Sequence, residues 1–496
     1  MDNDMMKLGD LLRHIDFLSF TGDRDVEIAN IQVDSRKIEK QGLFIAVKGT
    51  DLDGNQYIPD ALSQGAICIV SEFDPVLNPD EDHISWVKVA NDRLAASRLA
   101  EAFYDYPSRK LKLIGVTGTN GKSTIVNFLY QLFENLGFKT GLFSTIGNRI
   151  HNKAIGATLT TPDPVSLSRS LAEMVNEGCD YVFMEVSSHA LAQERIAALE
   201  FDGGVFTNIT RDHLDYHHTF ADYIKTKKIF FDNLPQNAFA LLNSDDRTGR
   251  VMGQNTTARK VTYGVKGMAD YKAQILEYDL NSMLLEIDGQ EIYTTITGEF
   301  NAYNLLATYS VGCLLGVEAR EVLRVLSAIK EIPGRLEKVK VVEGKAIGFV
   351  DYAHTPDAVE KVGSTLKKLI QGDGRLIIVL GCGGDRDKTK RPLMASAAAS
   401  NSDIAILTSD NPRNEDPEEI LVDMLSQLPP HLLAHTFKVK DRKEAIRMAV
   451  SMAADKDVIL VAGKGHETYQ IVKERKLPFD DRVVLHEALK EKYKTH

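Results

Sequence analysis

Short apolar stretches alternate along this chain with longer segments in which apolar residues recur every three or four positions. The first pattern predicts buried β-strands, and the second predicts amphipathic helices. In the middle of the chain the apolar stretches are residues 111–116, 181–186, 204–208 and 238–243. Buried strands that alternate with helices are typical of a mostly parallel α/β sheet, so we expect such a sheet here.

The same alternation divides the chain into three predicted α/β domains. Residues 1–107 combine short strands with short helices. Residues 108–335 contain the parallel sheet and a hairpin-rich segment over 260–297. Residues 336–496 contain four more buried strands, over 346–350, 375–380, 403–408 and 457–462. Ligands of such sheets bind at the carboxyl ends of strands, so the loops that follow these strands are the first place to look for chemistry.

A glycine-rich segment, GVTGTNGKST over residues 115–124, lies between the strand 111–116 and an apolar-faced helix. The backbone N–H groups of such a loop converge on phosphate at a helix N-terminus, where the helix dipole favours negative charge. Lys122 would reach the terminal phosphates of a nucleotide, and the Ser123 hydroxyl would contact magnesium. Val116 occupies the first glycine position of the common G-x-x-x-x-G-K-[ST] pattern. A glycine-rich turn before an ordinary helix is the alternative, and it leaves the Lys-Ser pair unexplained.

The net charge and the composition of the chain argue against several classes of binding partner. Lys and Arg total 59 against 70 Asp and Glu, a net charge of −11, which argues against nucleic acid or an anionic membrane as partner. The four cysteines are scattered, which indicates a reducing compartment. The first residues lack a targeting pattern, and no apolar stretch approaches the length of a membrane span. We expect a cytoplasmic monomer that acts on small molecules, without nucleic acid and without membrane insertion.

Polar residues follow two predicted strands of the central sheet. Glu185 lies at the end of one strand, where a carboxylate near a phosphate loop commonly holds magnesium. A glutamate in such a place can also be a helix cap or a surface residue. The segment 207–218 favours the metal interpretation because hydroxyls, carboxylates and imidazoles, including Asp212 and His213, are concentrated in it. Surface solubility alone does not explain that density, although His217 and His218 can be simply solvated.

Lys227 lies in a predicted helix over 220–231. Three- and four-residue spacing places it on one face with Phe220, Tyr223, Ile224 and Phe231. An apolar environment favours the neutral amine, which reacts with carbon dioxide to give a carbamate, a carboxylate able to bind metal. The alternative is a side chain that extends along the apolar surface to solvent. The pattern alone favours this alternative.

Two further segments can contact a nucleotide. Asn301 lies at the start of a long predicted helix, where it can cap the helix or touch a base; the pattern does not separate the two. The segment Asp351-Tyr-Ala-His354-Thr-Pro-Asp357 follows a buried strand and places two carboxylates and an imidazole in one turn. An Asx-type turn before a helix explains that segment equally well.

Three loops of the last predicted domain combine charges of both signs. They are residues 381–391, 409–413 and 463–467, and each follows a buried strand. A cleft with guanidinium and carboxylate groups suits a zwitterionic ligand, because guanidinium pairs bidentately with carboxylate while carboxylates hold ammonium. Any one loop could be a surface salt-bridge cluster. Three at equivalent strand ends favour a ligand site.

These motifs together resemble those of the Mur ligases, the ATP-dependent amide-forming enzymes of peptidoglycan synthesis. The resemblance spans nearly the whole chain, and the family's loop has its first glycine one place earlier than the common pattern, as here. The residues that carry it are 34–36 (DSR), 42–46 (GLFIA), 53–54 (DG), 118–123 (GTNGKS), 185–189 (EVSSH), 210–215 (TRDHLD), the Asn301 helix and 351–357 (DYAHTPD). It implies an N-terminal UDP-binding α/β domain (1–107), a central P-loop ATPase domain with a mostly parallel sheet (108–335) and a C-terminal Rossmann-like domain that binds the amino acid (336–496).

The resemblance also implies roles for single residues. ATP would contact Gly118, Thr119, Asn120, Gly121, Lys122, Ser123, Thr124, Asn301, Arg335, Asp351 and His354. Magnesium would be held by Ser123, Glu185, His213 and Lys227 as its carbamate, which reverses the preference for a solvent-exposed lysine. The catalytic residues would be Lys122, Glu185, His213 and Lys227. The UDP-sugar dipeptide would contact Ser35, Thr160, Thr161, Ser187, Gln193 and Arg195, with Leu159 where many relatives have Asn.

The loop Asp410-Asn411-Pro412-Arg413 matches the form associated with meso-diaminopimelate, and Arg386, Gly463 and Glu467 match its other contacts. Diaminopimelate differs from lysine by a distal carboxylate, with which Arg413 would pair. Lysine would leave that guanidinium desolvated without a partner. The implied reaction is phosphoryl transfer from ATP to the D-glutamate γ-carboxylate of UDP-N-acetylmuramoyl-L-alanyl-D-glutamate, followed by attack of the diaminopimelate amine.

Three alternatives to this reaction stay open at this point. One is a lysine-adding ligase of the same family. Another is a ligase like folylpolyglutamate synthetase, which shares the ATP core but lacks the front domain that residues 1–107 supply. The third is an ATP-driven switch or scaffold, in which Arg386, Arg413 and Glu467 would have no explanation.

Overall fold

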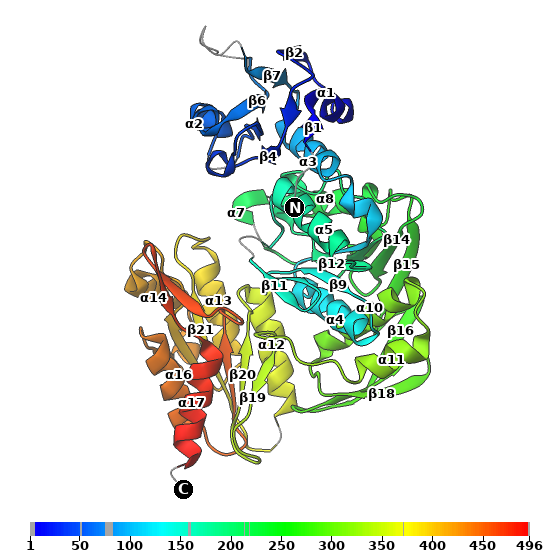
Figure 1. The fold of residues 1–496 in the computed structure, drawn as a ribbon. Coiled ribbons are helices and arrows are strands. Elements are labelled where there is room, and N and C mark those ends of the chain that lie inside the picture. The colour runs from blue at the N-terminus through cyan, green and yellow to red at the C-terminus, as the bar shows by residue number, and fades with distance from the viewer. Residues whose placement is uncertain are drawn as a thin grey trace. The chain divides into compact units, whose positions relative to one another are not determined.

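The computed structural model describes residues 5–49, 52–74, 83–156, 160–212, 214–217, 219–370 and 372–494. Their contacts define two compact units. The first is drawn from residues 1–118, 129–207 and 221–261, and the second from 119–128, 208–220 and 262–496. Figure 1 shows the chain coloured from blue at the N-terminus to red at the C-terminus. Within the described ranges, no helix combines the length and the apolar character that crossing a bilayer requires.

The first unit begins with a five-stranded sheet. Its order is β2-β7-β6-β5-β4, in which β4 to β7 run parallel and β2 is antiparallel to β7. Successive side chains of β5 point to opposite faces, so Leu43 packs towards helix α3 while Phe44 packs towards helix α2. The elements are β2 (Ser19–Thr21), β4 (Asn30–Gln32), β5 (Gly42–Ile45), α2 (Ile58–Gln64), β6 (Ala66–Ser71), β7 (Ser85–Lys88) and α3 (Asp92–Phe103).

The remainder of the first unit is built on a second sheet with β8 at its centre. Its strands in the first unit have the order β11-β10-β9-β12-β8-β13-β14, and those from β9 to β14 in that order are parallel. The four strands predicted for the middle of the chain correspond to β8, β12, β13 and β14, which confirms the mostly parallel sheet. Strands β9 to β11 were not predicted. The bounds are β8 (Lys112–Thr117), β9 (Thr140–Phe143), β10 (Asn148–Ile150), β11 (Lys153–Ile155), β12 (Tyr181–Glu185), β13 (Gly203–Phe206) and β14 (Phe239–Asn243).

Helices and a small antiparallel segment follow the predicted pattern. The glycine loop leads into α4 (Lys122–Asn135), and the helix predicted over 220–231 is α8 (Phe220–Asp232). Residues 260–297 contain the predicted hairpins: β16 (Tyr271–Tyr278), β17 (Met283–Ile287) and β18 (Gln290–Thr294) are antiparallel neighbours. The long helix after them is α10 (Glu299–Leu314).

The last part of the chain forms a six-stranded sheet of order β19-β20-β24-β21-β22-β23, parallel except for β19. Alternate residues of each strand face opposite sides, so Ile378 packs with α12, α13 and α14 while Ile377 packs with α16 and α17. The strands are β19 (Glu337–Val339), β20 (Ile347–Asp351), β21 (Leu376–Cys382), β22 (Ile404–Ser409), β23 (Thr436–Lys438) and β24 (Val458–Ala462). The helices are α12 (Pro356–Leu369), α13 (Lys390–Ser400), α14 (Pro417–Leu425), α16 (Arg442–Met452) and α17 (Asp481–Lys494).

This sheet with helices on both faces is the predicted Rossmann-like architecture. Its strands end in the three charged loops that the sequence singled out, after β21, β22 and β24. The boundaries at residues 107 and 335 stay a prediction.

A buried carboxylate joins helix α3 to the elements beside it in the first unit. The Glu101 side chain accepts hydrogen bonds from the Ser108 hydroxyl at 2.6 Å and from the Ser168 hydroxyl of α5 (Pro164–Asn176) at 3.0 Å. Burial raises the pKa of Glu101 above its ordinary value of 4.5, and the two hydroxyls offset this only in part. Ionisation of Glu101 therefore opposes folding.

We expect Glu101→Gln to remove a pH-dependent loss of stability. Between pH 4.5 and the raised pKa the unfolded chain ionises while the folded chain keeps its proton, so wild-type stability falls as pH rises through that window. Gln keeps both serine hydrogen bonds and does not ionise. Unfolding temperatures measured from pH 4 to pH 8 should therefore shift in favour of the variant as pH rises. Glu474→Gln, at an exposed position, is the control. A constant difference between Glu101→Gln and wild type would contradict the assignment.

Candidate active site

The glycine loop has the backbone conformation that a phosphate-binding loop needs. Gly118 and Gly121 have φ values of 147° and 91°, in a region that favours glycine. The Lys122 ammonium donates to the carbonyl of Thr119 at 2.7 Å, so the lysine lies over its own loop. The loop can therefore present backbone N–H groups and one ammonium to the same anion.

Asn208 holds the glycine loop from the neighbouring strand end, within the second unit. Its backbone carbonyl accepts from Thr119 N at 2.8 Å, and its side chain accepts from Asn120 N and donates to Asn120 O, both at 3.1 Å. Thr210 N also donates to the Thr119 hydroxyl at 3.0 Å. Asn208 lies in the segment 207–218 that the sequence singled out, but the sequence predicted no role for it. The available signal was an amide side chain directly after a buried strand.

Glu185 is neither a helix cap nor a surface residue, so both alternatives for it are wrong. Only 1% of the residue is exposed, and the following helix α6 (Ser188–Ala192) is capped by Ser187. One carboxylate oxygen, Oε1, accepts from the Ser144 hydroxyl at 2.8 Å and from Thr145 N at 2.7 Å. Within the described ranges no donor contacts the other oxygen, which leaves it available to a hard cation.

Lys227 is buried, with 1% of its surface exposed, so the alternative of a lysine that extends to solvent is wrong. Its ammonium donates to the carbonyl of Gly118 at 3.0 Å and lies 3.4 Å from the Thr117 hydroxyl. The amine also lies 4.8 Å from the centre of the Tyr223 ring. Lys227 therefore contacts the start of the glycine loop inside the first unit.

In the second unit, Arg335 contacts the end of the glycine loop. Its guanidinium donates to the Ser123 hydroxyl at 2.8 Å and lies 4.6 Å from the centre of the Tyr352 ring. Thr124, Asn301 and Arg335, all predicted to contact ATP, line one small cavity. The structure thus places these predicted nucleotide residues together.

Asn301 does not cap helix α10, so that alternative is wrong. The N-cap position is Gly298, and the Asn301 amide instead donates to Thr297 O and accepts from Asn304, both at 2.8 Å.

Asp351 does form an Asx-type turn, because one of its oxygens accepts from Ala353 N at 2.7 Å. Its other oxygen accepts from Leu336 N at 2.6 Å, and burial raises its pKa. His354 donates from Nδ1 to the carbonyl of Tyr352 at 2.8 Å. The turn is therefore present, and its Asp351 carboxylate is bound by backbone N–H groups.

The residues predicted to hold the sugar dipeptide form a cluster in the first unit. Arg195 donates to Thr161 O at 2.8 Å and to the Gln193 side chain at 3.0 Å. The Thr161 hydroxyl lies 3.3 Å from the Ser187 hydroxyl, and Thr160 accepts from Thr145 at 3.1 Å. The structure brings these five predicted residues together.

One residue predicted to contact the sugar dipeptide, Ser35, is not observed in that cluster in the described part of the chain. Ser35 is buried in a short turn that Asp34 caps, and no contact between it and the cluster is observed among the described residues. His213 and Leu159 lie outside the described residues. No group of three or more His, Cys, Asp or Glu side chains is arranged to hold a metal in the part of the chain that is described.

The three charged loops of the last sheet meet, as predicted. The carbonyl of Asn411 accepts from Gly384 N at 2.9 Å, and the Asn411 side chain donates to Glu467 at 2.9 Å. Gly463 lies against Asp410: a Cβ at that glycine would be 2.8 Å from the Asp410 carboxylate. The three strand ends therefore form one polar surface.

Arg413 lies in this surface with a second guanidinium nearby. One of its nitrogens donates to Gly384 O at 2.7 Å, and its backbone φ is 51°. Burial, reinforced by the neighbouring Arg386, lowers the pKa of Arg413 from its ordinary value. A partly desolvated cation beside another cation is stabilised by an anionic ligand.

A fully buried ion pair fixes the ends of β22 and β24. Arg442 and Asp481 are joined by two hydrogen bonds, of 2.8 and 2.7 Å. The same guanidinium donates to Ser409 O at 3.3 Å and to Ala462 O at 2.9 Å, which are the last residues of the two strands. The loops that carry Asp410 and Gly463 therefore begin from a common anchor.

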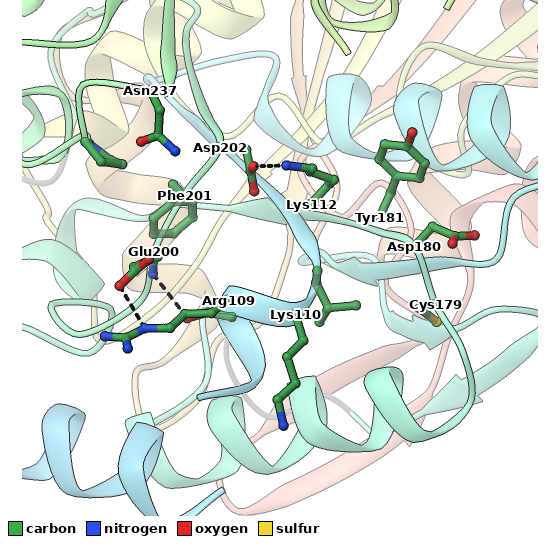
Figure 2. A pocket seen from close by; sticks show the side chains of 13 residues that line it. Arg109, Lys110, Lys112, Cys179, Asp180, Tyr181, Glu200, Phe201, Asp202 and Asn237 are labelled. Atoms are coloured by element: carbon green, nitrogen blue, oxygen red, sulfur yellow. Dashed lines mark hydrogen bonds and ion pairs between the residues drawn. The ribbon is translucent and has the colours of Figure 1, made fainter. Parts of the chain in front are cut away.

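A separate cavity of ≈ 460 Å³ lies at the amino ends of β8 and β12 in the first unit. Figure 2 shows that two of its cations point to acidic neighbours: Lys112 contacts Asp202 at 2.7 Å and Arg109 contacts Glu200 at 2.8 Å. Burial raises the pKa of the Cys179 thiol there to about 11, so it is unreactive near neutral pH. This cavity lies at the other end of β8 from the glycine loop and is not the predicted site.

Comparison with protein families gives three matches in chain order. Residues 27–104 match the Mur ligase family catalytic domain, residues 116–312 match the Mur ligase middle domain, and residues 334–465 match the Mur ligase glutamate ligase domain.

Individual relatives are similar over almost their whole length. A protein of Cytophaga hutchinsonii called UDP-N-acetylmuramoyl-L-alanyl-D-glutamate–2,6-diaminopimelate ligase is 49% identical, with 98% of this chain and 99% of the relative covered. A Bacteroides fragilis protein of the same name is 47% identical over 97% of this chain and 99% of the relative. A solved structure described by that name has a TM-score of 0.69 at 29% identity and covers 99% of both chains.

Proposed function

This chain belongs to the Mur ligase family, and from that premise we propose that it adds meso-diaminopimelate to UDP-N-acetylmuramoyl-L-alanyl-D-glutamate at the expense of ATP. The observation that carries the proposal is the 49% identity, over 98% of this chain, to a relative named as a ligase of UDP-N-acetylmuramoyl-L-alanyl-D-glutamate and 2,6-diaminopimelate. The three-domain α/β architecture agrees with it. We further infer that the protein acts in the cytoplasm, as a monomer.

The glycine loop is the proposed ATP site. Lys122 and the loop N–H groups would stabilise the charge on the phosphoryl group as it moves to the D-glutamate γ-carboxylate. The loop's attachment to Asn208 supports this role, because a preorganised loop does not have to rearrange during the reaction. Thr124, Asn301 and Arg335 would contact the rest of the nucleotide, together with Asp351 and His354.

Glu185 is the proposed magnesium ligand in the first unit. Its buried carboxylate keeps one oxygen without a donor among the described residues, which fits a hard cation. Ser123, His213 and a carbamate on Lys227 complete the proposed set. Magnesium would neutralise phosphate charge when bound.

The acyl phosphate formed in the first step is attacked by the amine of diaminopimelate. The nitrogen forms a bond to the carbonyl carbon, the carbon–oxygen bond to phosphate breaks, and the amine loses a proton. Arg413 and Arg386 would pair with the distal carboxylate of diaminopimelate, and Asp410 and Glu467 would hold its ammonium. Thr160, Thr161, Ser187, Gln193 and Arg195 would orient the acceptor, with Ser35 on its UDP part.

An assay of ADP release tests the reaction. With the UDP-sugar dipeptide present, we expect turnover with meso-diaminopimelate and at least about 100-fold lower kcat/KM with L-lysine, because lysine leaves the Arg413 guanidinium without a partner. Mass spectrometry of the product should show the dipeptide lengthened by one residue. ADP release without any amino acid would instead favour an ATP-driven switch.

Arg413→Ala should lower kcat/KM for diaminopimelate by about 100-fold, since hydrogen bonds to charged groups contribute roughly 1.5–3 kcal/mol each. The KM for ATP should stay within about twofold of wild type, because the glycine loop is unaltered. Arg475→Ala removes an exposed arginine of the same unit and is the matched control. Equal kinetics of the two variants would remove Arg413 from the pocket.

Lys227→Ala should lower kcat by about 100-fold or more if a carbamate stabilises charge in the reaction. In buffer with ¹³C-labelled bicarbonate, wild type should give a carbamate carbon resonance that Lys227→Ala lacks. Lys225→Ala, which removes an exposed lysine of the same helix, should keep both the activity and the resonance. A resonance that persists in Lys227→Ala would place the modification elsewhere.

A further inference from the structure

Lys464 is a fully buried cation between two of the charged loops. None of the residue is exposed, and it follows Gly463 at the end of β24. Its ammonium lies 2.8 Å from a Glu467 oxygen, 3.1 Å from the Asn411 side-chain oxygen and 3.9 Å from an Asp410 oxygen. One buried ammonium thus joins the loop after β22 to the loop after β24.

The contacts of Lys464 orient the two carboxylates it touches. Glu467 uses a single oxygen, Oε2, to accept from both Lys464 and Asn411. Among the described residues no hydrogen bond reaches Glu467 Oε1 or the Asp410 carboxylate, which Lys464 holds only by the ion pair at 3.9 Å, and the two side chains keep 18% and 12% of their surface exposed. The inner oxygen of Glu467 is therefore fixed, while the remaining oxygens are open to a ligand.

Asn411 takes part in the same arrangement. Its side-chain oxygen accepts from Lys464 and, at 2.9 Å, from the backbone N–H of Ile471, while its side-chain nitrogen donates to Glu467. These bonds occupy both ends of the amide. Asn411 therefore acts on a ligand through Glu467 and the loop backbone.

The charges also select the kind of ligand. Burial of an ammonium is costly unless carboxylates compensate it, so Lys464 needs the acids beside it. Two carboxylates against one ammonium leave one negative charge, which one incoming ammonium would balance. Arg413, in the loop after β22, offers the complementary positive charge. The surface thus offers one uncompensated negative charge beside the guanidinium groups of Arg413 and Arg386, which suits a head group with one ammonium and one carboxylate.

We propose that Lys464 is a positioning residue for the amino-acid substrate: it fixes Asp410, Asn411 and Glu467 and cancels one of the two carboxylate charges. This role rests on the proposed function, because diaminopimelate is the amino acid whose distal ammonium and carboxylate fit the surface. Lys464 itself touches no substrate, and its effect is transmitted through the loops.

The test is Lys464→Met, which removes the charge at nearly constant side-chain length. The KM for meso-diaminopimelate should rise at least about tenfold, while the KM values for ATP and for the UDP-sugar dipeptide stay within about twofold. Lys438→Met removes an exposed lysine that pairs with Glu418 in the same unit, and it should leave all three KM values unchanged. An unchanged KM for diaminopimelate in Lys464→Met, or an equal rise of all three values, would overturn the role.

If Lys464→Met does not fold, as judged by its thermal unfolding, Lys464→Gln replaces it, because an amide can still donate to Glu467. A selective rise in KM for diaminopimelate of about fivefold or more then supports the role, and no selective rise overturns it. The activity of the wild-type protein distinguishes the proposed function from the proposed role of Lys464. Failure of wild type to use diaminopimelate refutes the proposed function, whereas wild-type turnover with Lys464→Met behaving like Lys438→Met refutes only the role of Lys464.

Discussion

Parallel strands bring their carboxyl ends to one edge of a sheet. This constraint positions the loops that carry most of the candidate site residues. The glycine loop, Glu185 and Asn208 all leave that edge of the sheet around β8. The loops with Asp351, Asp410 and Gly463 leave the same edge of the last sheet, after β20, β22 and β24. Residues far apart in the sequence therefore become neighbours at the ends of the strands.

These edges contain buried charges that the fold must compensate. Arg442 is matched by Asp481, and Lys464 by the carboxylates of the neighbouring loops. Replacing one residue of such a pair leaves an uncompensated buried charge. The resulting loss of folding stability is far larger than that from losing an exposed ion pair. The same pairs fix the loops whose side chains would bind a zwitterion. Stability and substrate geometry thus depend on the same contacts in this part of the molecule.

Much of the architecture follows from patterns that act within a few residues. Runs of apolar residues predicted β8, β12, β13 and β14, and the helical period predicted α4 and α8. The short strands β9 to β11 were missed because residues 140–155 mix polar and apolar positions without a clear period. The burial of Lys227 was misjudged from spacing alone, since spacing gives the face of a helix but not what covers that face.

The sequence by itself determined the pattern of strands and helices and the position of the glycine loop. It also indicated that the three charged loops belong to one ligand site. These features depend on local periodicity and on recognisable motifs. The tertiary structure alone decided which atoms meet. In the structure Asn301 does not cap helix α10, Asn208 is hydrogen-bonded to the glycine loop, and the Lys464 ammonium lies between two loops. The contacts of Asn208 and Lys464 join residues that follow separate strands, and their geometry arises only when the strands pair in register and the loops pack.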